Sequence, residues 1–176
     1  MTLFSKREKT ADTEINWDQV YEDYLPRVYN FFRFRARDEA LAEDLTSTTF
    51  EKAWYARESF RKDWGGVSTW LFTIARNVEI DHFRKSRPEV QLEAAELIAD
   101  SFSVEEIAHQ LAESQRLEIL LKELSVRELD LISLKYGAEM TNREIAQVTG
   151  LSESNVGTIV NRVVKKLRSA WEMNHE

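Results

Sequence analysis

The chain has 176 residues, a net charge of −7, no cysteine and three histidines. Disulfides and thiolate metal sites are therefore excluded, and His82, His109 and His175 lack the spacing of metal ligands. No apolar run approaches the roughly 20 residues that span a bilayer. We expect a cytoplasmic protein of one ordinary or two small domains, without metal or cofactor and without stable membrane insertion.

Negative charge is concentrated in the middle of the chain. Residues 89–130 hold 11 acidic and 3 basic side chains, a net charge of −8, so the rest of the chain carries +1 of the total of −7. Arg84, Lys85 and Arg87 form one basic cluster, and residues 162–168 contain another. This order favours two DNA-facing modules joined by an acidic spacer.

The first half of the chain predicts a polar tail and three helices. The tail covers residues 1–15, and apolar side chains then recur at helical spacing over residues 17–32, with a bend expected at Pro26. A second helix is expected over residues 38–57, and a loop with a Gly-Gly pair leads into a third near Ser68. The side chains expected to face inward are Leu41, Leu45, Ala53, Leu71, Ile74 and Ile80.

Residues 141–168 predict a helix-turn-helix because three local signals coincide there. Thr141 and Glu144 have the spacing of a capping box, Gly150 offers a left-handed end to the first helix, and Ser152 can cap the second. The alternative is an ordinary amphipathic helix whose cations complement its own dipole. The side chains expected to be buried are Ile145, Ala146, Leu151, Val156, Ile159, Val160, Val163, Val164 and Leu167.

The outward face of the second helix has short polar side chains near its N-terminal end and cations near its C-terminal end. This division is typical of a helix that reads base edges in the major groove and holds phosphates with its other end. The predicted duplex-DNA contacts are Arg143, Ser152, Ser154, Asn155, Thr158, Asn161, Arg162, Lys165, Lys166 and Arg168.

The predicted fold is all-α, with two small helical domains and an acidic linker. The domains cover residues 16–87 and 103–176, the linker covers residues 88–102, and the second domain has four helices and ends in the helix-turn-helix. Two further capping boxes begin helices of the second domain. They pair Ser103 with Glu106 and Ser125 with Glu128.

Two motifs of the first domain carry a resemblance to a known family. The stretches AEDLTSTTFEKAW and STWLFTIARNVEIDHFRKSR, followed by the helix-turn-helix, resemble the extracytoplasmic-function sigma factors, two-domain promoter-recognition subunits of bacterial RNA polymerase. The resemblance covers nearly everything after residue 16. It implies a region 2 domain that binds core RNA polymerase and opens the minus-ten element, and a region 4 domain that binds the minus-thirty-five element. It also implies an anti-sigma partner that holds the protein inactive.

The resemblance places a polymerase-docking face on the second helix. The docking residues that it implies are Asp44, Leu45, Thr49, Phe50 and Trp54. The family pattern has Gln-Glu where this chain has Ser47 and Thr48, a departure that affects the polar contacts of this face. Simple core packing is an equal alternative for Leu45 and Trp54.

By the same resemblance, the loop over residues 59–67 captures a base flipped out of the minus-ten strand, and the following helix holds the strand. Aromatic walls and nearby cations suit both tasks. Trp70 has a core-packing alternative that we favour over a stacking role, and Asp81 is expected to orient an arginine. The minus-ten contacts implied are Phe60, Arg61, Lys62, Trp64, Trp70, Arg76, Asn77, Arg84, Lys85 and Arg87.

No catalytic constellation is evident in the sequence, since it has no phosphate-binding glycine loop and no nucleophile with a base partner. We therefore expect a protein that is not an enzyme. Two other classes remain open: a stand-alone helix-turn-helix regulator that dimerises through residues 104–124, and a helical adaptor that binds only protein. An aromatic and basic single-strand surface on the first domain favours an initiation factor over both.

Overall fold

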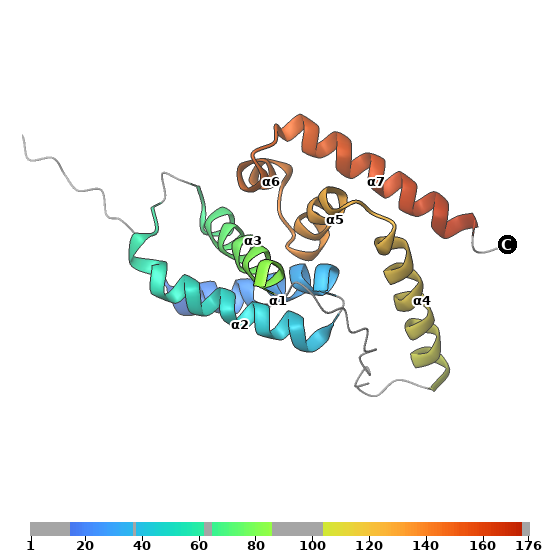
Figure 1. Cartoon of the computed structure of the whole chain (residues 1–176), viewed down its shortest axis with the longest axis horizontal. Helices are drawn as coiled ribbons and strands as arrows, with labels where there is room; N and C mark the ends of the chain where they lie inside the picture. Colours follow the sequence, from blue (N-terminus) through green and yellow to red (C-terminus); the bar gives the residue numbers. More distant parts are fainter. Residues whose placement is uncertain (1–14, 37, 62–64, 86–103, 174–176) are drawn as a thin grey trace, which may run out of the picture.

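The computed structural model describes residues 15–36, 38–61, 65–85 and 104–173, with side chains in the last range from residue 113 onward. Within these ranges the regular structure is entirely helical (Figure 1). The elements are α1 (Trp17–Ala36), α2 (Glu39–Ala56), η1 (Arg57–Ser59), α3 (Val67–Lys85), α4 (Val104–Lys122), α5 (Val126–Ile132), η3 (Ser133–Gly137), α6 (Asn142–Thr149) and α7 (Glu153–Met173).

Helices α1, α2 and α3 pack on one another and form the N-terminal bundle. Helix α1 continues without a break through Pro26, so the proline does not end it. Asp38 caps α2, and its carboxylate accepts a hydrogen bond of 3.3 Å from the Leu41 N–H. The side chains of Phe31, Phe32 and the apolar face of α3 fill the centre of the bundle and exclude water from it.

One expected core residue of this bundle is wrong. Ile80 is 57% exposed. It lies one turn after Asn77 and one turn before Arg84, on the solvent face of α3, whereas the buried stripe of that helix runs through Leu71, Ala75 and Val78. The apolar side chain of Ile80 was therefore not sufficient to predict which face of α3 it occupies.

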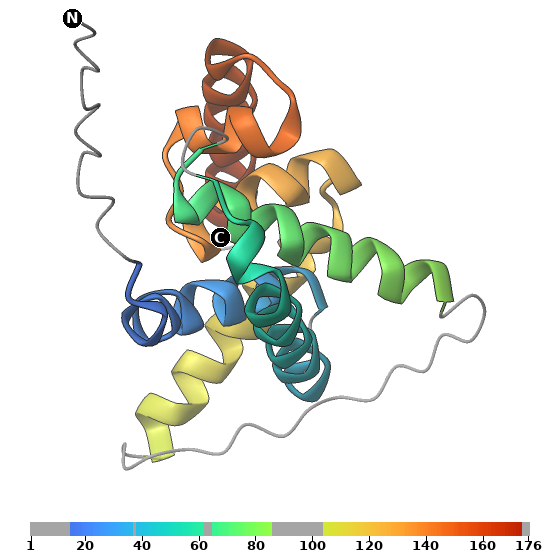
Figure 2. The same ribbon diagram turned by 90° about the vertical axis from the view of Figure 1, so that its left-hand side faces the viewer.

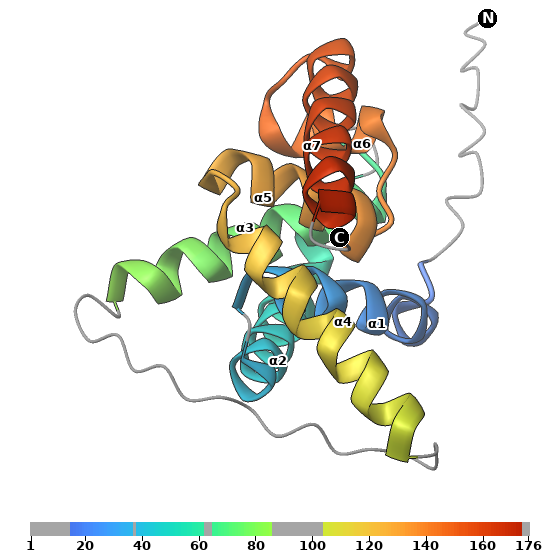
Figure 3. The same cartoon turned by 90° about the vertical axis from the view of Figure 1, so that its right-hand side faces the viewer.

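The C-terminal bundle contains α4, α5, α6 and α7, as expected, together with the unexpected π-helical turn η3. Both capping boxes that lie among the described residues are confirmed, at Ser125 with Glu128 and at Thr141 with Glu144. The box predicted at Ser103 lies outside the described residues. Helix α4 packs on α7 and extends away from the other helices (Figure 3).

The two bundles are in direct contact, as two perpendicular views show (Figures 1 and 2). The turn η3 packs on α1, and α6 packs on α3. A Cβ added at Gly137 would lie 3.0 Å from the backbone of Asn30 and Phe31, so only glycine permits this approach of η3 to α1. One buried apolar cluster consequently continues from the N-terminal into the C-terminal bundle.

The capping boxes give the C-terminal bundle a pH-dependent stability. Hydrogen bonds from the Ser125 N–H and hydroxyl lower the pKa of Glu128. Burial raises the pKa of Glu144, but hydrogen bonds from the Thr141 N–H and hydroxyl outweigh burial, and the net pKa is lowered. Both carboxylates therefore stabilise the fold above their unfolded pKa of about 4.3, and this stabilisation is lost as the pH falls through the folded values.

We expect the melting temperature of the full chain to fall as the pH decreases below about 5. A Glu144→Gln variant should show a smaller fall, because glutamine can cap the helix but does not titrate there. Thermal unfolding between pH 7 and pH 3, followed by circular dichroism, measures the difference. The exposed Glu123→Gln variant is the control, and an equal flattening of its profile would contradict the assignment to the cap.

Candidate nucleic-acid interface

The turn of the helix-turn-helix is fixed by three backbone features. The Thr141 side chain accepts from the Glu144 N–H and begins α6, and Gly150 ends α6 with a φ of 74°. The Ser152 hydroxyl then accepts from the Asn155 N–H at 3.2 Å and begins α7. A side chain at φ 74° would be strained, which explains the glycine. The helix-turn-helix predicted from the sequence is confirmed.

Helix α7 buries one side of its surface and exposes the other, as its sequence pattern predicts. Val156, Ile159, Val160 and Val163 are buried against the rest of the C-terminal bundle. Gly157 leaves room on α7 for the Asn142 side chain of α6, since a Cβ at position 157 would lie 3.2 Å from the side-chain amide nitrogen of Asn142. The exposed side chains on this helix-turn-helix include every predicted duplex-DNA contact: Arg143, Ser152, Ser154, Asn155, Thr158, Asn161, Arg162, Lys165, Lys166 and Arg168.

Two cations of this exposed face reach back to the start of α5. Arg162 lies 3.5 Å from the Glu128 carboxylate with 67% of its side chain exposed, and Lys166 donates to the Glu123 carbonyl at 3.3 Å. Exposed pairs of this kind contribute little free energy. Both side chains can therefore leave these partners for a ligand at small cost.

The predicted minus-ten contacts on α3 have different environments. Asn77, Arg84 and Lys85 are exposed, whereas Arg76 is half-buried and directed at the C-terminal bundle. Asp81 accepts from Arg84 at 3.0 Å, so its expected orienting role is supported, and it also pairs with Lys52. Arg61 is exposed in the loop before α3. Lys62, Trp64 and Arg87 lie outside the described residues.

An aromatic cluster lies beside this loop and joins α1 to the start of α3. The Trp70 ring lies 5.3 Å from Phe60 and 5.6 Å from Trp17, measured between ring centroids, and Phe60 lies 6.1 Å from Trp17. These contacts support the core-packing alternative for Trp70. Trp17 was expected only as part of a helix face, because its partners follow it by more than 40 positions.

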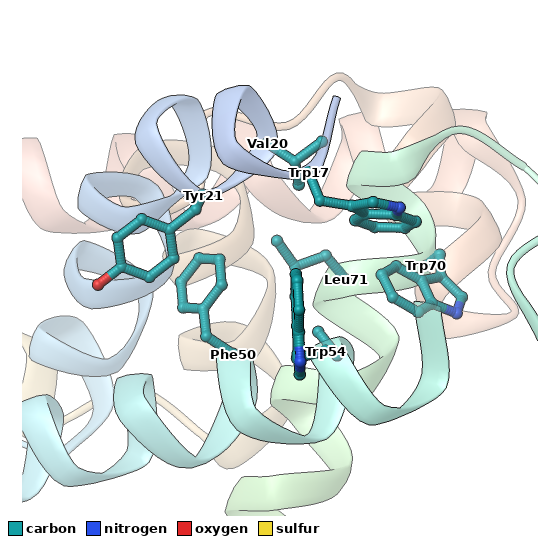
Figure 4. Close-up of a pocket in the computed structure, with 8 residues that line it drawn as sticks. Trp17, Val20, Tyr21, Phe50, Trp54, Trp70 and Leu71 are labelled. Atoms are coloured by element: carbon teal, nitrogen blue, oxygen red, sulfur yellow. The ribbon is translucent and has the colours of Figure 1, made fainter. Parts of the chain in front are cut away.

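The cluster forms one wall of an apolar pocket of about 240 Å³ (Figure 4). Its lining residues come from all three helices of the N-terminal bundle and include Trp17, Tyr21, Phe50, Trp54 and Trp70. The Arg57 guanidinium stacks over the Trp54 ring at 3.9 Å and holds it at the rim. Polar groups are almost absent from the lining, so the pocket suits an apolar side chain better than the polar edge of a base.

The residues proposed for polymerase docking divide into accessible and buried ones. Asp44 and Trp54 are exposed and Phe50 is half-buried. Leu45 is 2% exposed and Thr49 is fully buried, with the Thr49 hydroxyl donating to the Leu45 carbonyl at 2.7 Å. In this arrangement Leu45 and Thr49 pack inside the bundle, so the core-packing alternative holds for Leu45 and not for Trp54.

A second hollow on the N-terminal bundle was not expected from the sequence. It is an open depression of about 500 Å³ between α1 and α2. Ser47, one of the two residues that depart from the family pattern, lines it together with Tyr29 and Glu43. Burial raises the pKa of Tyr29, and the adjacent Glu39 and Glu43 raise it further. The hollow therefore combines an apolar floor with an acidic edge.

The described residues contain no group of three or more acidic or histidine side chains that could hold a metal ion. None of the described helices is long and apolar enough to cross a membrane.

Comparisons with known proteins agree with this arrangement. Residues 20–89 match sigma-70 region 2, and residues 120–169 match sigma-70 region 4. The chain is 31% identical over 156 residues to the ECF RNA polymerase sigma factor SigM of Bacillus subtilis, covering 88% of this chain and 94% of SigM. It is 27% identical over 177 residues to SigW of the same organism, covering 93% of this chain and 92% of SigW.

Two solved structures share the fold. The sigma factor RpoE of Bartonella quintana, crystallised with the anti-sigma factor NepR, superposes with a TM-score of 0.69 at 22% identity, covering 89% of this chain and 96% of that chain. CnrH, in complex with the cytosolic domain of CnrY, superposes with a TM-score of 0.61 at 24% identity. The match covers 89% of this chain and 86% of the CnrH chain. With two matching sigma-70 regions and a relative of more than 30% identity along nearly its whole length, this chain belongs to the ECF RNA polymerase sigma factors.

Proposed function

We propose that this ECF sigma factor reads the minus-thirty-five element with the exposed face of α7 and the minus-ten strand with α3 and the preceding loop. The observation that carries the first assignment is the complete exposure of the polar and cationic side of α7 on a well-capped helix-turn-helix. Short polar side chains at the start of α7 suit base edges, and Lys165, Lys166 and Arg168 suit phosphates. Residues 16–87 and 103–176 are the two promoter-binding domains of this proposal, with residues 1–15 as a tail and residues 88–102 as the linker.

The minus-ten assignment rests on the basic side of α3 and on the aromatic cluster. Asn77, Arg84 and Lys85 are accessible to a single strand, and Arg61 adds a cation beside Phe60. Stacking on aromatic side chains contributes about 1–3 kcal/mol per base and tolerates any sequence. Within this cluster Trp70 packs against Trp17 and Phe60, and we assign the stacking role to Phe60.

The docking face for core RNA polymerase lies on the exposed side of α2. Asp44, Phe50 and Trp54 provide a carboxylate and two aromatic rings, and tryptophan is among the residues that most often dominate interface energies. Buried Leu45 and Thr49 support this face from inside. The polymerase performs the reaction, so this protein needs no catalytic chemistry of its own. This protein would act in the cytoplasm, together with the polymerase.

An anti-sigma factor is a further proposed partner. RpoE of Bartonella quintana was solved with the anti-sigma factor NepR, and CnrH was solved with the cytosolic domain of CnrY. The apolar pocket between Tyr21 and Trp54 offers such a partner a place for one apolar side chain. The rival function, a stand-alone regulator, does not explain the aromatic and basic surface of the N-terminal bundle.

Binding to core RNA polymerase tests the proposal. Trp54→Ala is expected to weaken binding about thirtyfold or more, because truncating an interface hot-spot tryptophan costs roughly 2 kcal/mol or more. The Phe83→Ala variant removes an equally exposed aromatic from α3 and should bind as the wild type does. Surface plasmon resonance on immobilised core enzyme measures both, after circular dichroism has shown that each variant is folded. Equal affinities of the two variants would contradict the docking face.

A further inference from the structure

A cluster of four charged side chains joins the two bundles. The Asp130 carboxylate of α5 accepts from Arg35 of α1 at 3.1 Å and from Arg76 of α3 at 2.8 and 3.3 Å. Arg35 also pairs with Glu79 of α3. Burial raises the pKa of the Glu79 carboxyl, although Arg35 partly opposes this effect. Three of the four side chains are largely withdrawn from water, with exposures of 12% for Arg35, 5% for Glu79 and 13% for Asp130, and Arg76 is 27% exposed.

Among the residues that the structure describes, the carboxylate of Asp130 accepts hydrogen bonds only across the interface. The hydrogen bonds that it accepts among the described residues come from Arg35 and Arg76, both in the N-terminal bundle. Within its own bundle the backbone carbonyl of Asp130, and not its carboxylate, accepts hydrogen bonds, from the Ser133 hydroxyl at 2.9 Å and from the Ser133 N–H. The side chain of Asp130 therefore contributes to holding the bundles together and little to the fold of its own bundle.

Neighbouring contacts hold the same interface. Arg76 donates to the Val148 carbonyl at 2.8 Å, and the Thr69 hydroxyl lies 3.0 Å from the Gln147 side-chain oxygen. Arg27 donates to the Ala138 carbonyl at 2.8 Å, next to Glu139, whose φ of 54° is unusual for a residue other than glycine. Each of these contacts involves the first helix of the helix-turn-helix or the turn before it.

This closed arrangement is incompatible with reading both promoter elements. The minus-ten and minus-thirty-five positions are separated by about 25 base pairs, or about 85 Å at roughly 3.4 Å per pair along one strand. Helix α3 and helix α6 are in direct contact, and α7 itself is only about 31 Å long at 1.5 Å per residue. The bundles must separate before the two DNA-facing surfaces can occupy both elements.

We propose that Asp130 is an intramolecular clasp that holds this sigma factor closed and competes with promoter phosphates for Arg76. The Arg76 guanidinium forms a bidentate pair with the Asp130 carboxylate, and it could bind a phosphate with the same geometry. When the bundles separate, Arg76 becomes available to the minus-ten strand and Arg35 keeps Glu79 as a partner. Ion pairs withdrawn from water gain little net free energy, so a partner can open the clasp, whereas removing the Asp130 charge alone leaves Arg76 without its carboxylate partner and disfavours closure.

The chain contains no cysteine, so introduced cysteines are unique attachment sites. Spin labels at Ala40→Cys of α2 and Ser169→Cys of α7, both exposed positions, report the distance between the bundles of the free full-length chain. We expect Asp130→Asn to increase the population at long distances by roughly tenfold or more, because removing one partner strands the other charge. Glu123→Gln removes an exposed carboxylate of the same bundle and should leave the distances unchanged. A distance distribution of folded Asp130→Asn that equals the wild type would overturn the clasp.

A second measurement does not depend on the stability of the Asp130 variant. Cysteines placed at Thr69 and Gln147, on facing sides of the interface, can be joined by a reducible bis-methanethiosulfonate linker. The linked chain should lose at least about nine-tenths of its transcription with core polymerase and regain it on reduction, while each single-cysteine chain stays active. Full activity of the linked chain would show that separation is unnecessary and would overturn the inference.

The inference rests on the proposed function in the competition of promoter phosphates for Arg76 and in this transcription experiment, whereas the spin-label distances test the closure alone. If the unmodified chain stimulated no transcription, the proposed function would fail while the spin-label distances could still support the clasp. If the unmodified chain were active and the distances of Asp130→Asn equalled those of the wild type, the clasp alone would fail.

Discussion

Replacing Phe72 by alanine is expected to lower the free energy of unfolding by about 3–5 kcal/mol. Phe72 is fully buried in α3, and its ring lies 5.8 Å from that of the fully buried Phe31. Removing the ring leaves a cavity at the point where the core of the N-terminal bundle continues towards η3. Because a typical domain is stable by only about 5–15 kcal/mol, such a loss should be visible as a large shift of the urea midpoint.

The control for this prediction is Phe83→Ala, eleven positions further along α3 and in an exposed rather than a buried environment. Phe83 is 50% exposed near the end of α3, so its truncation should change the stability by no more than about 0.5 kcal/mol. Both variants are compared by urea unfolding monitored by circular dichroism. Similar midpoints for the two variants would show that the interior of the bundle is not packed as described.

Replacing Arg162 by alanine is expected to relax the preference for one base pair of the minus-thirty-five element by about 1–3 kcal/mol. Arg162 lies on the exposed face of α7 between Thr158 and Lys166, and only a weak, exposed pair with Glu128 holds it. A guanidinium in this position can bond two acceptors of a guanine in the major groove. Transcription from a library of promoters that vary in this element measures the change in preference.

Lys166→Ala provides the contrast to Arg162→Ala. Lys166 lies one turn further along α7, where we expect it to hold a phosphate and carry no sequence information. Its loss should weaken all promoters nearly equally and reduce the slope of log affinity against log salt by about one. If Arg162→Ala left the base preferences unchanged and Lys166→Ala altered them, α7 would lie in the groove differently from our proposal.

The sequence predicted the C-terminal bundle well because its signals are local. Capping boxes at Ser125 and Thr141, the left-handed Gly150 and the valine-rich stripe of α7 each involve residues within a few positions of one another. Such patterns determine helix ends and helix faces directly from backbone hydrogen bonding and periodicity. The π-helical turn η3 has no comparable local signal, and it was missed.

The environments of individual site residues were harder to predict. Leu45 and Thr49 share a motif with Asp44 and Trp54, yet the first two are buried and Trp54 is 53% exposed. Ile80 has an apolar side chain on a solvent-facing position of α3. In each case the residue type alone was insufficient, because exposure depends on which neighbouring helix covers that face.

The contact between the bundles could not be predicted from local patterns. Asp130 lies 95 positions from Arg35 and 54 positions from Arg76, and their pairing exists only in the folded arrangement. From the sequence, Asp130 is only one of the 11 acidic side chains of residues 89–130, and nothing nearby in the sequence assigns it a partner. The structure adds a specific partner for one of those acids, and with it a specific means of closing the molecule.

Run-off transcription with reconstituted core polymerase and a promoter library tests the central claim most directly, that this chain is a promoter-specific sigma factor. We predict transcripts that begin at defined positions only when the chain is present, with a sequence preference in both the minus-ten and minus-thirty-five elements. The chain alone should bind the same duplexes weakly, because one helix-turn-helix per molecule makes few contacts. Tight, sequence-specific binding as a homodimer without polymerase, together with no stimulation of transcription, would contradict this account and favour a stand-alone regulator.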